Sequence, residues 1–188
     1  MEQTMMKQDI MEQTIADQNL MDQNLTNQNL MDQNLTDQNL TDQNQLDQNL
    51  IRQMIQLAIG QLQYSYTPYS GFRVGAALLS KSGKLYTGCN IENAAYTPTN
   101  CAERTAFFKA VSEGEREFQA ICVVGGKDGI LTGYAAPCGV CRQVMMEFCD
   151  PKKFQIILAT GTDHYDVYTL EELLPQGFGP ANLEMNGK

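Results

Sequence analysis

The chain has 188 residues and a formal net charge of −9, and this acidity is unevenly distributed. Residues 1–50 hold nine acidic residues and one basic residue, so the remaining 138 residues are close to neutral. All glycines, prolines, cysteines and aromatic residues also follow Leu50. We therefore predict one globular domain, residues 51–188, behind a low-complexity polar extension, residues 1–50. A domain of this size is large enough to bury a core.

The same composition argues against several classes of protein. No segment approaches the roughly 18 consecutive apolar residues of a membrane helix. The N-terminus lacks the basic and apolar regions of a secretory signal. A near-neutral domain with an acidic extension is poorly suited to nucleic acid, because phosphate contacts need clustered Lys and Arg. We expect a cytoplasmic protein with no nucleic-acid or membrane partner, in which the six cysteines stay reduced.

A five-residue repeat, with units such as MDQNL and TDQNL, runs through the extension from about Asp17 to Leu50. On a helix a period of five turns about 140° per unit, so the leucines form no stripe. On a strand, successive leucines would alternate between faces. The pattern favours a disordered or partly helical tail, with a regular helix and a coiled or β-helical assembly element as the alternatives.

The globular region opens with an amphipathic pattern. Apolar residues at helical spacing predict a helix over 51–62: Ile51, Met54, Ile55, Ala58, Ile59 and Leu62. The segment 64–71 is typical of a loop. A hairpin is expected next, with strands over 72–80 and 85–90 joined by a turn at 81–84.

Helices and strands alternate in the second half of the domain. We expect helices over 101–112 and 138–149, and buried strands over 120–124 and 154–159. A strand over 164–169 should lead into a helical turn that ends at Leu174. This order of elements predicts an α/β fold in which a mixed sheet carries helices on both faces.

Three cysteines stand at predicted helix starts. Cys101-Ala-Glu103 opens one helix, and Pro137-Cys138-Gly-Val-Cys141 opens another. Helix N-termini stabilise thiolates through their unpaired N–H groups and the helix dipole. Three thiolates suit Zn²⁺, and three protein ligands leave its fourth position for water, as in catalytic zinc sites. We predict one zinc ion per subunit, bound by Cys101, Cys138 and Cys141.

A structural zinc site would need a fourth protein ligand. Four residues are available, although their positions are more typical of core or surface residues: Cys89, Cys122, Cys149 and His164. The sequence therefore favours the open, catalytic type of site.

Three further side chains lie beside the predicted ligands. Glu103 is placed to take a proton from a zinc-activated water and return it to a substrate, and a solvent-facing helix position is the less favoured alternative. Arg104 and Gln143 follow ligands directly and are expected to hydrogen-bond sulfur, unless they serve only surface or packing roles.

These motifs resemble the signature of zinc deaminases, in which a ligand-x-Glu motif is followed by Pro-Cys-x-x-Cys. Residues 69–77, 88–96 and 173–178 are also similar to the small homotetrameric cytidine deaminases. The resemblance covers residues 51 to about 182 and does not include the repeat.

The resemblance implies a three-layer α/β/α fold with a five-stranded mixed sheet, and a homotetramer whose sites combine several subunits. It implies that Glu103 moves a proton from the zinc water to the pyrimidine and later to the leaving ammonia. It also implies that Arg104 and Gln143 tune the thiolates. The implied substrate-binding residues are Asn90 and Glu92 at the ribose hydroxyls, Phe72 and Phe178 on the base, Tyr96 near the site across an interface, and the backbone of Ala102 at the base edge.

The predicted reaction is hydrolytic deamination of cytidine and 2′-deoxycytidine to uridine and 2′-deoxyuridine plus ammonia, a step of pyrimidine salvage. Glu92 favours a free nucleoside over a nucleotide, because a phosphate calls for Arg or Lys. Three alternatives stay open. The first is the same zinc core with another small aminated heterocycle, such as blasticidin S, as substrate. The second is a non-catalytic domain that zinc stabilises. The third makes the repeat an assembly or tethering element with catalysis secondary.

Overall fold

The computed structural model describes residues 46–183. Most of the five-residue repeat lies outside these residues, so its predicted conformation is not addressed, and the domain boundary at residue 50 stays a prediction. The last unit of the repeat, residues 46–50, leads directly into the first described helix, α2, which spans Gln48–Gln61.

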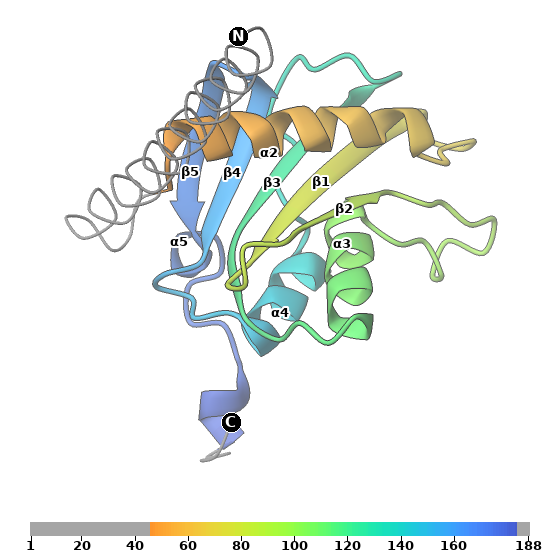
Figure 1. The fold of residues 1–188 in the computed structure, drawn as a ribbon. Coiled ribbons are helices and arrows are strands. Elements are labelled where there is room, and N and C mark those ends of the chain that lie inside the picture. The colour runs from red at the N-terminus through yellow and green to blue at the C-terminus, as the bar shows by residue number, and fades with distance from the viewer. Residues whose placement is uncertain (1–45, 184–188) are drawn as a thin grey trace, which may run out of the picture. The chain divides into compact units, whose positions relative to one another are not determined.

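The described residues form five strands and several helices in the predicted order (Figure 1). The elements that follow α2 are β1 Phe72–Ser80, β2 Leu85–Cys89, α3 Ala102–Ser112, β3 Phe118–Lys127, α4 Gly139–Phe148, β4 Gln155–Gly161, β5 His164–Thr169 and α5 Leu170–Leu173. Single 3₁₀ turns occur at Leu62–Tyr64 and Pro180–Leu183.

The strands form one mixed sheet in the order β2-β1-β3-β4-β5. The pair β3–β4 is parallel, and the other three pairs are antiparallel. Parallel pairing requires a crossover between β3 and β4, and α4 lies in that crossover. The prediction of a five-stranded mixed sheet flanked by helices is confirmed.

Each face of the sheet has its own core, because side chains alternate along a strand. Ala76 and Leu78 of β1 belong to the cluster that includes α3, α4 and α5, whereas Ala77 and Leu79 belong to the cluster of α2. Figure 1 shows α2 across one face of the sheet, with α3 and α4 on the other. The molecule therefore has the three layers that the resemblance implies.

Helix α2 begins three residues before the predicted start at Ile51, with Asp47 at the N-cap position, where its side chain makes no capping hydrogen bond. The predicted apolar stripe is buried at Met54, Ile55 and Ala58. The helix packs very closely on β1: a Cβ atom at Gly75 would lie 2.0 Å from the Ala58 carbonyl oxygen. A glycine in this central strand is thus required by the approach of the helix.

Strand β3 extends beyond the predicted 120–124 at both ends. The extension includes two consecutive glycines, Gly125 and Gly126, although glycine is disfavoured in strands. Both pair with β1, and a Cβ atom at Gly126 would lie 1.8 Å from the Ile130 carbonyl oxygen. A close backbone approach therefore accounts for glycine at this position.

None of the helices between residues 46 and 183 is long and apolar enough to cross a membrane.

Candidate active site

The N-termini of α3 and α4 bring three cysteines together. Cys101 is the N-cap residue of α3, Cys138 is the N-cap residue of α4, and Cys141 is the third residue of α4. Neither N-cap sulfur caps its own helix, so both remain available to a metal. The Cys138 sulfur lies 3.8 Å from that of Cys101 and 3.5 Å from that of Cys141.

The donor set fits zinc in kind and in spacing. Zinc–sulfur bonds of about 2.3 Å in tetrahedral geometry place sulfur atoms roughly 3.8 Å apart. The three sulfurs of the cluster all lie within 4.8 Å of one another, and all six cysteines are free thiols. Cys141 is buried while Cys138 is exposed, so the cluster is reachable from solvent on the Cys138 side.

The surroundings favour ionisation of one thiol even without metal. Hydrogen bonding from Cys141, reinforced by Arg104, lowers the pKa of Cys101 to about 5. Because Cys141 donates that hydrogen bond, its own pKa is raised. A metal binds cysteines as thiolates and displaces their protons. Cys101, whose pKa is lowered, can therefore act as the first thiolate ligand.

Glu103 is the second residue of α3, and its side chain is only 4% exposed. It is the one buried charged residue within the described part of the chain. Burial, together with the nearby Cys101 thiolate, raises the pKa of Glu103 to about 7 in the metal-free protein. A carboxyl group with such a pKa can both accept and donate a proton near neutral pH.

Arg104 contacts the cluster through its guanidinium group. One terminal nitrogen donates to the Thr99 carbonyl oxygen at 2.9 Å and lies 3.7 Å from the Cys101 sulfur. Gln143 behaves differently, because its amide nitrogen donates to the Phe178 carbonyl oxygen at 2.8 Å. The structure thus connects Gln143 with the C-terminal segment, and its role toward the thiolates stays a prediction.

Asn90 and Glu92 follow β2 and bind backbone groups of the preceding loop and of β1. The Asn90 amide accepts from the Val74 N–H at 2.9 Å and donates to the Phe72 carbonyl at 2.8 Å. Glu92 accepts from the backbone N–H groups of Tyr69 and Ser70 at 3.0 and 3.2 Å.

The pKa of Glu92 lies below its usual range. The main cause is a hydrogen bond from the Ser70 hydroxyl, and the backbone N–H groups of Tyr69 and Ser70 add to it. Glu92 is therefore an anion at neutral pH.

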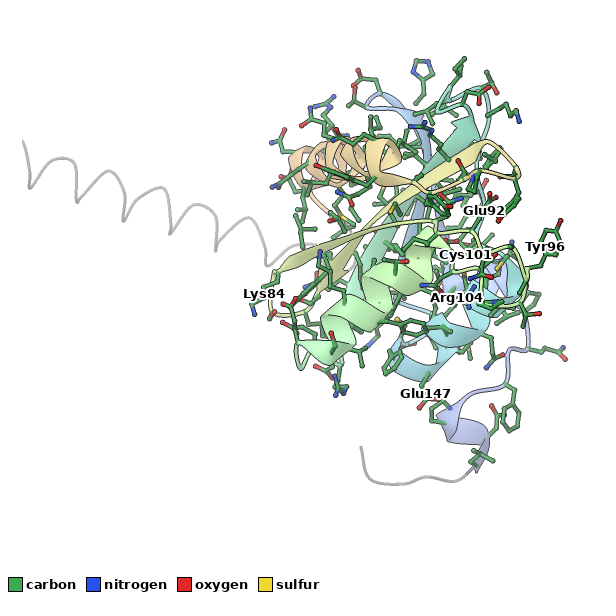
Figure 2. All side chains as sticks on the ribbon, turned by 90° about the vertical axis from the view of Figure 1, so that its right-hand side faces the viewer. Lys84, Glu92, Tyr96, Cys101, Arg104 and Glu147 are labelled. Carbon is green, nitrogen blue, oxygen red and sulfur yellow. The ribbon has the colours of Figure 1, made fainter. Side chains whose placement is uncertain are left out.

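Three predicted substrate-binding aromatics are exposed within one chain. Phe72 is 41%, Phe178 56% and Tyr96 76% exposed. Tyr96 adopts a left-handed backbone conformation, and its ring centroid lies 6.3 Å from that of Tyr69. Figure 2 shows Tyr96 and Glu92 at the same end of the domain as Cys101 and Arg104, with Lys84 at the opposite end.

Ala102, the predicted contact to the base edge, is fully buried at the start of α3. A Cβ atom at Gly88 of β2 would lie 2.4 Å from the Ala102 carbonyl oxygen. The first turn of α3 therefore lies directly against β2. This contact determines how close Cys101 and Glu103, at the start of α3, lie to the sheet.

Two residues that help to build the site were not predicted. Thr105 donates from its hydroxyl to the Cys89 carbonyl at 3.0 Å and accepts from the Asn100 amide, which ties α3 to the end of β2. Arg142 binds two backbone carbonyls near Cys138. The only signal in the sequence was the positive charge of Arg142 near the predicted start of a helix, because a cation there is unfavourable without a specific partner.

The fold and the cluster define a zinc-binding α/β domain with a buried carboxyl beside the metal position. Comparison with family models matches residues 48–158 to the cytidine and deoxycytidylate deaminase zinc-binding region. The match includes all three clustered cysteines and Glu103, and it ends within β4.

Two named relatives are similar over most of their length. The chain is 49% identical to a cytidine deaminase of Sporosarcina psychrophila, over 64% of this chain and 85% of the relative. It is 48% identical to a cytidine deaminase of Halalkalibacterium halodurans, over 70% of this chain and 97% of the relative.

The crystal structure of a cytidine deaminase from Burkholderia pseudomallei is similar at 44% identity, with a TM-score of 0.61 over 67% of this chain and 97% of the other. The chain belongs to the cytidine and deoxycytidylate deaminase family.

Proposed function

We propose that this protein is a zinc-dependent hydrolase that converts cytidine and 2′-deoxycytidine to uridine and 2′-deoxyuridine with release of ammonia. The observation that carries the proposal is a buried carboxyl, Glu103, two residues from the first of three clustered cysteines. Family membership and two cytidine deaminase relatives at 48–49% identity support the same reaction.

Cys101, Cys138 and Cys141 would hold the zinc ion, which when bound supplies an acidified water as the nucleophile. Glu103 accepts a proton from the attacking water and delivers it to N3 of the pyrimidine. The same carboxylate then takes the proton of the new hydroxyl group at C4 and passes it to the departing amino group, so that the C–N bond breaks, the carbonyl forms and ammonia leaves; one residue thus serves as base and as acid. Arg104 orients the Cys101 sulfur, because it contacts that atom while bound to the Thr99 carbonyl.

Substrate recognition is assigned to the residues at the same end of the domain. We assign Asn90 and Glu92 to the ribose hydroxyls, because each retains hydrogen-bonding capacity beyond its backbone contacts. Phe72 and Phe178 would pack on the base, and the Ala102 backbone would meet the base edge. The anionic Glu92 favours a nucleoside over a nucleotide, because a phosphate group would be repelled.

We further propose a homotetramer, as the resemblance implies. Tyr96 and Phe178 are large aromatics that remain exposed within residues 46–183, which suits residues that complete a site across a subunit interface. A cytoplasmic setting is also proposed, since a reducing compartment keeps the three ligand thiols free.

The decisive test follows uridine formation from cytidine by the purified full chain and by Glu103→Gln at equal zinc content. General acid–base catalysis predicts a loss of roughly 10²–10⁴-fold in kcat for the variant. Glu113→Gln, at the exposed C-terminal end of the same helix, is the matched control and should keep the parent rate.

Absence of turnover in the zinc-loaded parent would overturn the cytidine assignment. A panel of 2′-deoxycytidine, deoxycytidylate and blasticidin S would then identify the substrate class. Equal rates in Glu103→Gln and the parent would overturn the proton-transfer role of Glu103.

A further inference from the structure

Arg142 binds the peptide groups on both sides of a metal ligand. Its side-chain Nε donates to the Pro137 carbonyl oxygen at 2.7 Å, and its backbone N–H makes the ordinary helical hydrogen bond to the Cys138 carbonyl oxygen at 3.0 Å, which does not depend on the side chain. These two carbonyls belong to the peptide groups that flank the Cys138 α-carbon. Their orientation determines the direction in which the Cys138 sulfur points.

Cys138 has little else to hold it in place. It is exposed, and so are the next two residues, Gly139 and Val140, whereas Pro137 before it is buried. Apolar packing therefore anchors only one side of this ligand. The hydrogen bond of the Arg142 side chain to the Pro137 carbonyl supplies a restraint that packing does not.

The position of Arg142 is electrostatically unfavourable by itself. It is the fourth residue of α4, near the positive end of the helix dipole, and the first turn of α4 has no acidic residue. A cation at this place needs specific acceptors. The carbonyls of Pro137 and Leu173 are those acceptors, and both lie outside α4.

The second acceptor is the residue that directly precedes the C-terminal segment, residues 174–183. Leu173 is the last residue of α5, and its carbonyl receives the other bond of the Arg142 guanidinium. Two more residues of α4 contact the segment. Gln143 donates to the Phe178 carbonyl, and a Cβ atom at Gly177 would lie 3.1 Å from the Met146 sulfur.

We propose that Arg142 is a positioning residue whose single guanidinium group fixes both the metal ligand Cys138 and the start of the C-terminal segment that carries Phe178. A guanidinium presents donors in fixed directions, so it can bind two carbonyls that approach from different parts of the chain. An ammonium group on a flexible stem lacks this planar fork. The part of the proposal that concerns substrate binding rests on the proposed function, and the part that concerns the metal does not.

The test compares three variants of the full chain with the parent. Arg142→Gln removes the charge and the fork, and Arg142→Lys keeps the charge but removes the fork. Arg116→Gln is the matched control, because Arg116, which follows α3, also donates to two backbone carbonyls, that of Val111 in the last turn of α3 and that of Glu115 after it. Circular dichroism of each protein checks the fold.

Three measurements separate the roles. Competition with a zinc chelator gives the zinc affinity, and the absorption bands of the Co²⁺-substituted protein report the geometry of the thiolate ligands. Amide hydrogen exchange of residues 174–183 reports whether the C-terminal segment is held. Steady-state kinetics with cytidine add the separation of KM from kcat.

Both Arg142 variants should lose roughly 10- to 100-fold in zinc affinity, which is typical when a partner that orients a metal ligand is removed. Their cobalt spectra should shift, exchange of residues 174–183 should accelerate, and KM should rise. The control should match the parent in every measurement. If Arg142→Gln does not fold, Arg142→Lys carries the test.

Parent-like zinc affinity and cobalt bands in Arg142→Lys would overturn the proposal in favour of a simple charge effect. Parent-like values in Arg142→Gln would show that Arg142 does not position Cys138. Unchanged exchange of residues 174–183 in both variants would overturn its role for the C-terminal segment. Failure of the parent to deaminate cytidine would refute the proposed function while the metal measurements still decide the role of Arg142.

Discussion

Replacement of Gly88 by alanine is expected to damage the site without touching any ligand. The added Cβ atom would lie 2.4 Å from the Ala102 carbonyl oxygen, 2.6 Å from the Ala106 nitrogen and 3.0 Å from the Thr105 Cβ. Two of these atoms are backbone atoms of α3, which cannot rotate away. Since non-bonded heavy atoms pack at roughly 3.5 Å, the start of α3 must move by about 1 Å.

The displacement falls on the part of α3 that carries Cys101 and Glu103. A misplacement of about 1 Å in a catalytic arrangement lowers rates by on the order of 10²-fold. Overpacking of this kind also costs about 1–3 kcal/mol of unfolding free energy. We therefore expect Gly88→Ala to lower kcat/KM for cytidine about 100-fold and to lower the urea midpoint.

Gly60→Ala is the matched control, because no atom lies within 4 Å of the Cβ position at Gly60 in α2. Alanine is favoured over glycine in a helix by about 0.5–1 kcal/mol, so this variant should be more stable than the parent with an unchanged rate. Zinc content, initial rates and urea denaturation are measured on all three proteins. Gly88→Ala with the rate and stability of Gly60→Ala would refute the reasoning.

Three further predictions concern stability, acid sensitivity and thiol reactivity. Phe107 is 1% exposed, and its ring centroid lies 4.8 Å from that of Phe118. Phe107→Ala should therefore lower the unfolding free energy measured by urea denaturation by about 3–5 kcal/mol. Phe108→Ala, at a half-exposed neighbour, should lower it far less, and similar losses for both variants would contradict the assigned packing. Backbone and side-chain hydrogen bonds from Thr169 in the α5 capping box lower the pKa of Glu172. The stability that this ionised side chain contributes is present above its ordinary pKa of about 4.5 and is lost as pH falls through the lowered value. Glu172→Gln keeps a capping box and should therefore show a weaker loss of urea midpoint between pH 6 and pH 3, and equal losses would count against the assignment. Burial raises the pKa of Cys122 and Cys149, whereas Cys138 is exposed. Mass spectrometry after alkylation of the chelator-treated native protein should therefore find Cys138 modified before either of the other two. The reverse order would be inconsistent with the structure.

Much of the fold was predictable because it depends on local patterns. The helical spacing of Ile51, Met54, Ile55 and Ala58 matches the buried face of α2. The continuous apolar run of β1 matches a strand whose side chains enter the cores on both faces of the sheet. The exceptions lie where a neighbouring segment changed the local preference. The glycines of β3 are tolerated in a strand because they pair with β1, and Gly126 also faces the approaching Ile130 carbonyl.

The candidate metal ligands were predictable for the same reason. Cys138 and Cys141 are separated by one helical turn, and Cys101 and Cys138 both stand at helix starts that the sequence marks locally. Only the tertiary structure places the two helix starts together, and only it shows that Glu103 is buried. The partner of Gln143 was likewise invisible in the sequence, because Phe178 lies 35 residues away.

The sequence alone determined which chemistry this protein carries: three thiols, one carboxyl two residues from the first of them, and helices and strands of the right period. The tertiary structure decided how that chemistry is held. The closeness of α3 to Gly88, the bonds of Arg142 to Pro137 and Leu173, and the backbone contacts of Asn90 depend on the packing of distant segments. Residue type and spacing specify local geometry, whereas the acceptor that a long side chain reaches is determined only when the elements have packed.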